Sequence, residues 1–132
     1  MRMLIMALGM LLVLGGLAAA ADVTDKVRIE TLTVGLYPGM DPGMYVCAGG
    51  HLHIKATVEN LAGVALGKVR VAGKAFGADD GLLGAATASV KKATLAPNEK
   101  SEVDLEFLTI TGPKIKAVKR HELEVIEAPI RR

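Results

Sequence analysis

Apolar and polar side chains alternate along most of the chain after residue 26. In the segment HLHIKATVENL, residues 51–61, one face of an extended chain carries only apolar side chains: Leu52, Ile54, Ala56 and Val58. Successive side chains of a β-strand point to opposite faces, so this pattern predicts a half-buried strand with His51 and His53 on its wetter face. Residues 101–110 alternate in the same way, with an inward set, Val103, Leu105 and Phe107, and an outward set, Glu102, Asp104 and Glu106.

Three more segments show this pattern or a weaker form of it: residues 27–36, 67–77 and 82–90. A last strand is predicted from about Lys114 to Glu127, bent near residues 119–121. Glycine, proline, asparagine and aspartate mark the turns between strands: residues 37–50, 60–67, 78–81 and 95–100. Six or seven short strands at this spacing predict an all-β fold, a small antiparallel β-sandwich of immunoglobulin-like type. The cysteine and tryptophan pattern of antibody domains is absent, so the prediction concerns the architecture only.

The first 21 residues differ in kind from the rest. Arg2 precedes an apolar run without aspartate, glutamate or lysine, and a string of alanines closes it. This order predicts a secretory signal peptide cleaved near Ala20 or Ala21. The alternative is a retained helix, because the run from Met3 to Ala21 approaches the ~20 apolar residues that span a bilayer. The chain is therefore predicted to be periplasmic or secreted, with a signal peptide over residues 1–21 and one sandwich domain over residues 22–132.

Residues 54–107 carry a series of turn and core features in a fixed order. These are an asparagine after a strand, an aromatic strand end, an Asp-Gly hairpin, a Leu-x-Pro-x-Glu turn and a final phenylalanine: Asn60, Phe76, Asp80 with Gly81, Leu95 with Pro97 and Glu99, and Phe107. The order resembles that of the FxLYD domain family and related immunoglobulin-like domains of bacterial exported proteins. The tyrosine-aspartate pair that names the family is missing after Phe76. The resemblance implies a small β-sandwich on an exported protein and supplies no catalytic residues.

The charge and the aromatic content argue against nucleic-acid binding. The chain has 16 basic and 14 acidic side chains, four aromatic residues and no tryptophan. A near balance of charge gives no general attraction to a polyanion, and single-strand binders need aromatic stacking platforms. The one basic cluster, KIKAVKR at residues 114–120, is interpreted as a solvated strand edge, with a polyanion or membrane-surface patch as the alternative.

Catalytic constellations are missing from the sequence, and the protein is predicted not to be an enzyme. Neither a GxSxG elbow nor a phosphate-binding GxxxxGK[ST] loop occurs. The adjacent carboxylates Asp79 and Asp80 are explained by the hairpin turn in which they lie. A thiol nucleophile made of Cys47 and a histidine would be an unusual arrangement in so small a sandwich.

Sulfur and imidazole donors gather in GMDPGMYVCAGGHLH, residues 39–53, which holds the only cysteine, two of the three histidines and two of the six methionines. On a strand, His51 and His53 lie on one face about 7 Å apart. Thiolate, thioether and imidazole form a soft donor set that favours copper. The candidate metal ligands are Met40, Met44, Cys47, His51 and His53. Against this hypothesis, surface histidines, gap-filling methionines and a buried thiol are ordinary, and the spacing matches no strict metal motif.

Three functions remain open at this point. The first is a non-enzymatic binding or assembly module without a cofactor, whose partner is another exported protein or an envelope component and whose contact surface is the loop of residues 37–50. The second is a periplasmic copper-binding protein that uses Cys47, His51 and His53 with Met40 or Met44. The third is a membrane-anchored or filament-forming subunit with a retained N-terminal helix. The third histidine, His121, is in phase with Leu123 and Val125 and is predicted to face inward.

Overall fold

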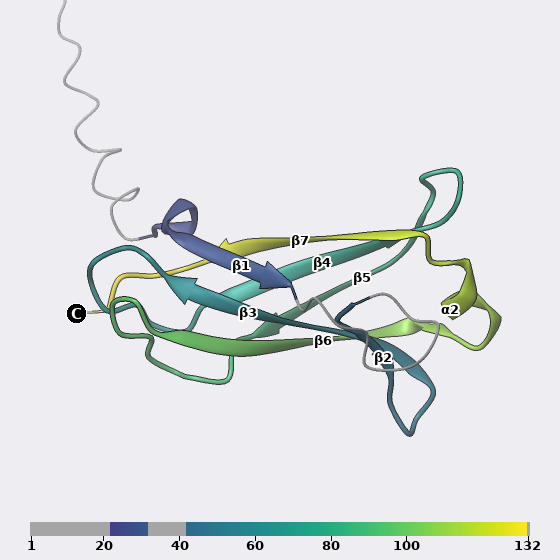
Figure 1. Ribbon diagram of the computed structural model, residues 1–132, viewed down its shortest axis with the longest axis horizontal. Coiled ribbons are helices and arrows are strands. Elements are labelled where there is room, and N and C mark those ends of the chain that lie inside the picture. The colour runs from purple at the N-terminus through teal and green to yellow at the C-terminus, as the bar shows by residue number, and fades with distance from the viewer. Residues whose placement is uncertain (1–21, 32–41, 132) are drawn as a thin grey trace, which may run out of the picture.

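The computed structural model describes residues 22–31 and 42–131. In these residues the chain forms, in order, the 3-10 helix η1 (Thr24–Lys26), β1 (Val27–Thr31), β2 (Met44–Val46), β3 (His51–Asn60), β4 (Arg70–Phe76), β5 (Leu82–Ser89), β6 (Lys100–Thr111), the short helix α2 (Pro113–Ala117) and β7 (Arg120–Glu127). The predicted all-β fold is confirmed, because seven strands form two antiparallel sheets that face each other (Figure 1). Over the described ranges, no helix is long and apolar enough to cross a membrane.

The first sheet is built around β3. Strand β6 pairs with residues His51 to Glu59 of β3. It therefore occupies one edge of β3 along nearly the whole length of that strand. Strands β1 and β2 therefore follow one another along the opposite edge, with β1 beside residues 56–60 and β2 beside residues 52–54. The second sheet has the order β5-β4-β7.

The core lies between the two sheets. Strand β3 alternates between buried and half-buried residues along its whole length, as its sequence pattern predicts. Its inward side chains pack with those of β6, β4 and the connecting segments in one apolar cluster, and burial of such surface contributes about 25 cal/mol per Å². Gly73 in β4 lies where the sheets approach closely: a Cβ there would stand 3.2 Å from Leu105 Cδ2 and from Phe107 Cζ of the facing sheet.

Two segments differ from the sequence prediction. The predicted loop of residues 37–50 contains β2, since the backbone of Met44–Val46 pairs with β3. The predicted last strand begins at Arg120 rather than Lys114, because Gly112 reverses the chain at φ 56° and Pro113 then starts α2. Proline suits a first helical position, where its missing N–H removes no hydrogen bond. Two lysines of the basic cluster, Lys114 and Lys116, therefore lie on a helical turn and not on a strand edge.

The predicted hairpin at residues 78–81 is confirmed. Asp80 has φ 62°, a left-handed conformation that aspartate tolerates better than most residues. The Arg120 guanidinium lies 4.1 Å from the centre of the Phe76 ring, and its Nε donates to Asp80 Oδ1 at 2.9 Å. Arg120 thus ties the turn to the start of β7.

Asn60 is the one fully buried polar residue in the part of the chain that the structure describes. Its Nδ2 donates to the carbonyls of Val64 at 2.8 Å and Leu95 at 3.0 Å, and its Oδ1 accepts from Ala62 N–H at 2.8 Å. Its side chain therefore joins the loop after β3 to the turn before β6. A buried amide with this many partners replaces the water that these carbonyls would otherwise require.

We expect Asn60→Ala to lower the free energy of unfolding by about 2–4 kcal/mol, since it leaves several buried backbone groups without partners. Urea denaturation followed by circular dichroism measures the change. Asn98→Gly is the matched control, because Asn98 has φ 66° and glycine adopts that conformation without strain. Equal losses for the two variants would contradict the role given to Asn60.

Candidate metal centre

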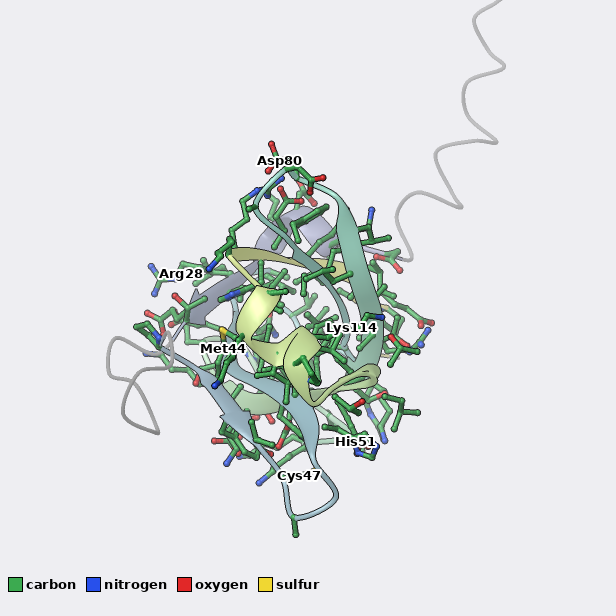
Figure 2. All side chains as sticks on the ribbon, turned by 90° about the vertical axis from the view of Figure 1, so that its right-hand side faces the viewer. Arg28, Met44, Cys47, His51, Asp80 and Lys114 are labelled. Atoms are coloured by element: carbon green, nitrogen blue, oxygen red, sulfur yellow. The ribbon has the colours of Figure 1, made fainter. Side chains whose placement is uncertain are left out.

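The hairpin between β2 and β3 positions the cysteine. Gly50 N–H donates to the Cys47 carbonyl at 2.9 Å, and Cys47 N–H donates to the His51 carbonyl at 3.1 Å. Gly50 has φ 83°, which glycine adopts at no steric cost. The tight turn places Cys47 at the same end of the sandwich as the β4–β5 turn that carries Asp80, and the two turns lie on opposite sides of that end (Figures 1 and 2).

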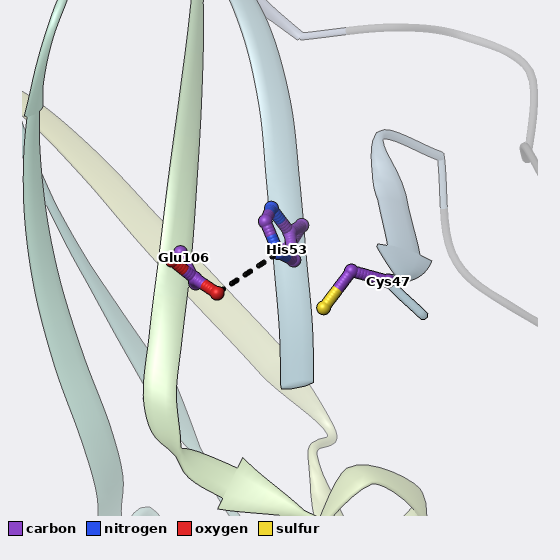
Figure 3. A group of neighbouring side chains, drawn as sticks. All are labelled: Cys47, His53 and Glu106. Carbon is purple, nitrogen blue, oxygen red and sulfur yellow. Dashed lines mark ion pairs between the residues drawn. The ribbon is translucent and has the colours of Figure 1, made fainter. Parts of the chain in front are cut away.

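Three donor groups converge from three places in the fold. One ligand atom each of Cys47, His53 and Glu106 lies within 4.8 Å of the other two. Cys47 follows β2, His53 lies on β3 and Glu106 on β6, and their side chains point toward one another (Figure 3). The register of the first sheet pairs His53 directly with Glu106, which explains their approach.

His51 borders the same cluster. Its Nδ1 lies 3.7 Å from Cys47 Sγ and 3.1 Å from Glu106 Oε2. Glu106 Oε2 also lies 3.6 Å from His53 Nε2. Donor atoms around a tetrahedral Zn²⁺ or copper ion, at bond lengths of about 2.0–2.3 Å, stand about 3.3–3.8 Å from one another. The three measured separations fall close to this range, and the ligand atoms of Cys47, His53 and Glu106 all lie within 4.8 Å of one another, so the cluster offers three converging donors with His51 beside two of them.

A hydrogen-bonded chain orients the ring of His53. Its Nδ1 lies 2.8 Å from Asp104 Oδ1 and 3.0 Å from the Tyr45 hydroxyl, and that hydroxyl donates to the other oxygen of Asp104. The Tyr45 ring covers the imidazole at 4.7 Å between ring centres. With the proton on Nδ1, shared with Asp104, the lone pair of Nε2 is directed at the cluster. A carboxylate that fixes the tautomer in this way is common behind metal-binding histidines.

His53 Nε2 is buried and, among the described residues, has no hydrogen-bond partner. The His53 side chain is only 13% exposed, compared with 29% for His51 and 45% for Glu106. The contact of His53 Nε2 with Glu106 Oε2, at 3.6 Å, is too long for a hydrogen bond. A cation between His53, Cys47 and Glu106 would satisfy this nitrogen.

The surroundings shift the pKa of two members of the cluster. The backbone hydrogen bond from His51, together with the imidazoles of His53 and His51, lowers the pKa of the Cys47 thiol from 9.0 to about 7 against the opposing effect of burial. Burial lowers the pKa of His53, but the neighbouring Asp104 and Cys47 outweigh it, and the net pKa is raised. Burial and the hydrogen bond to Asp104 raise the pKa of Tyr45, which therefore stays protonated at neutral pH.

The structure brings together three of the five sequence-predicted ligands: Cys47, His51 and His53. Met44 is a correction, because its side chain is 3% exposed and belongs to the core. It pairs with Ile54, so it lies on the face of the sheet opposite to His53. Met40 lies outside the described residues. His121, half-buried as predicted, pairs with Ala75 in the second sheet, away from the cluster.

Glu106 was not among the predicted donors, and neither Asp104 nor Tyr45 was predicted to orient His53. The alternating pattern of residues 101–110 placed Glu106 and Asp104 on a polar face, but it did not indicate which strand that face would join. The replacement of a methionine by a carboxylate changes the donor set from soft to borderline. One thiolate, two imidazoles and one carboxylate suit copper or zinc, whereas calcium and magnesium prefer oxygen ligands alone.

No family model, curated protein or solved structure matches the chain. The resemblance to FxLYD domains therefore stays a prediction that depends on turn and core residues.

In the metal-free protein we expect the rate of Cys47 alkylation by iodoacetamide to reach half its maximum near pH 7. The thiolate is the reactive form, and its population rises as pH passes the lowered pKa of about 7. His53→Ala removes one of the groups that lower this pKa, so its midpoint should move to higher pH. Mass spectrometry of the alkylated chain measures both profiles. His121→Gln is the control, and a midpoint near the ordinary thiol value in the unaltered protein would contradict the electrostatics described.

Proposed function

We propose that the protein is an exported, non-enzymatic metal-binding β-sandwich. Cys47, His53 and Glu106 hold the ion, and His51 completes a four-coordinate shell. This proposal joins the first two functions expected from the sequence, since the binding module would bind through its metal centre. The observation that carries the proposal is the buried Nε2 of His53, which lies beside a thiol and a carboxylate and has only an ion-pair contact of 3.6 Å with Glu106 Oε2.

The chemistry of the donors selects the cation. Cysteine and histidine are the usual ligands of zinc and copper, and affinity for divalent ions rises from zinc to copper in the Irving–Williams order. We therefore infer that Cu²⁺ binds more tightly than Zn²⁺. A copper–thiolate bond from Cys47 would also give the loaded protein a visible charge-transfer absorption, which zinc does not produce.

Equilibrium titration of the chain without its first 21 residues tests the site. We expect one Zn²⁺ or Cu²⁺ per chain, with the affinity lowered about 100-fold by Cys47→Ser or His53→Ala. His51→Ala and Asp104→Asn should each cost about tenfold, because His51 borders the cluster and Asp104 only orients His53. Competition with a chromogenic chelator of known affinity measures these constants.

Two matched variants serve as controls for the titration. His121→Gln removes the one histidine outside the cluster, and Met44→Leu replaces a core methionine with a residue of similar volume. Both should bind metal as the unaltered chain does. Binding that survives Cys47→Ser and His53→Ala together would sink the proposal, and so would a stoichiometry well below one.

Export is supported by the signal-like order of residues 1–21 and places the single cysteine in an oxidising compartment. A thiol that serves as a metal ligand is protected there from disulfide formation. We expect the protein recovered from its host to have a mass that corresponds to a chain beginning near Asp22. A mass that includes the first 21 residues would instead favour the retained N-terminal helix.

A further inference from the structure

A hollow of about 510 Å³ adjoins the metal cluster and shares Glu106 with it. Short residues of β4 and β5 line one side of it, and residues of β6 line the other: Ala72, Gly73, Ala85 and Ala86, with Leu108 and Thr109 opposite. Lys74 supplies the positive charge at its border, and Glu106 supplies the carboxylate that also faces His53. Hollows of about 300–1,000 Å³ are the size that holds small-molecule ligands.

The donors of the cluster differ in how readily an incoming ligand reaches them. His53 is nearly enclosed, whereas the Glu106 side chain is 45% exposed and borders the hollow. A carboxylate oxygen is also the hardest of the four donors, so it holds a borderline metal less firmly than a thiolate does. A ligand in the hollow would therefore meet the metal from the side of its weakest protein bond.

We propose that the hollow seats a small thiol that carries carboxylate groups, and that the seated thiol takes the metal by displacing Glu106. This inference rests on the proposed metal site. The ammonium group of Lys74 recognises a carboxylate of the ligand, and the small wall residues leave room for its chain. The protein is then a metal carrier that releases its ion by direct exchange, without waiting for the ion to dissociate into water.

The exchange step involves no change of oxidation state. A lone pair of the ligand's sulfur forms a new bond to the metal as the bond between the metal and Glu106 breaks. The thiol proton passes to the departing carboxylate. Cys47 and the two histidines keep the ion in place until further thiolates replace them.

Release of Zn²⁺ from the loaded protein to a chromogenic chelator tests this mechanism, with glutathione as the thiol. We expect the release rate to rise with glutathione concentration by about tenfold and then to level off as the hollow fills. Ala85→Leu fills the hollow without changing a metal ligand and should abolish most of this acceleration. Ala93→Leu makes the same change at an exposed position of a loop outside the hollow and should release zinc as the unaltered protein does.

Lys74→Glu is a second test variant. Lys74 is exposed, so this substitution leaves the hollow open. Its negative charge should weaken the glutathione effect about fivefold by repelling the ligand's carboxylates. Cysteamine is a thiol without a carboxylate, so the acceleration of zinc release by cysteamine should not fall in the Lys74→Glu variant. This comparison does not depend on how well Ala85→Leu folds.

The outcomes separate this inference from the proposed function. A chain that binds no metal refutes both. A chain that binds zinc tightly through Cys47 and His53 but releases it at a rate independent of glutathione keeps the metal site and loses the exchange mechanism. An acceleration that Ala85→Leu and Lys74→Glu leave intact would likewise overturn the hollow as the seat of the thiol.

Discussion

The register between β3 and β6 is the constraint on which both the core and the donor cluster depend. The sheet pairs Ile54 with Leu105 and His53 with Glu106, so apolar side chains of the two strands meet on one face and ionisable ones on the other. A slip of one residue would turn every side chain of one strand to the opposite face. The burial of the apolar face therefore also fixes the position of Glu106 beside His53. The cluster requires no folding energy of its own to bring these two groups together.

The remaining donors are placed by local structure on this frame. The four-residue turn after β2 holds Cys47 beside His51 through two backbone hydrogen bonds. The chain of Tyr45 and Asp104 then orients the His53 ring, and both residues lie on strands that pair with β3. The supports of His53 therefore lie on paired strands rather than on loops. The exposed donors, Glu106 above all, lie where a ligand can approach.

The hollow beside the cluster lies between β6 of the first sheet and strands β4 and β5 of the second. The pairing of β3 with β6 is interrupted between His51 and Leu52, where Leu52 faces Phe107 but His51 faces Thr111. Leu108, two residues after Glu106 and on the same outward face of β6, is 64% exposed and lines the hollow together with small residues of β5. At Gly84 the two strands come so close that a Cβ would stand 2.9 Å from Ile110 Cδ1, so β5 has little room for bulk there. The alanines and the single glycine of β5, which weaken its strand pattern in the sequence, are consistent with its proximity to β6.

The sequence by itself determined the strands and their faces, because the alternation of apolar and polar side chains is a local property with period two. It placed Leu52, Ile54 and Val58 inside, and it placed both histidines on the polar face. The sequence prediction was wrong at β2 and α2, because three paired residues and one short helical turn are too few to show a periodic pattern. Only the tertiary structure decided which polar faces meet, because pairing between strands that are about fifty residues apart depends on packing of the whole core. That choice brought Glu106 and Asp104 to His53, buried Met44 on the opposite face, and so changed the soft donor set expected from the sequence into a borderline one.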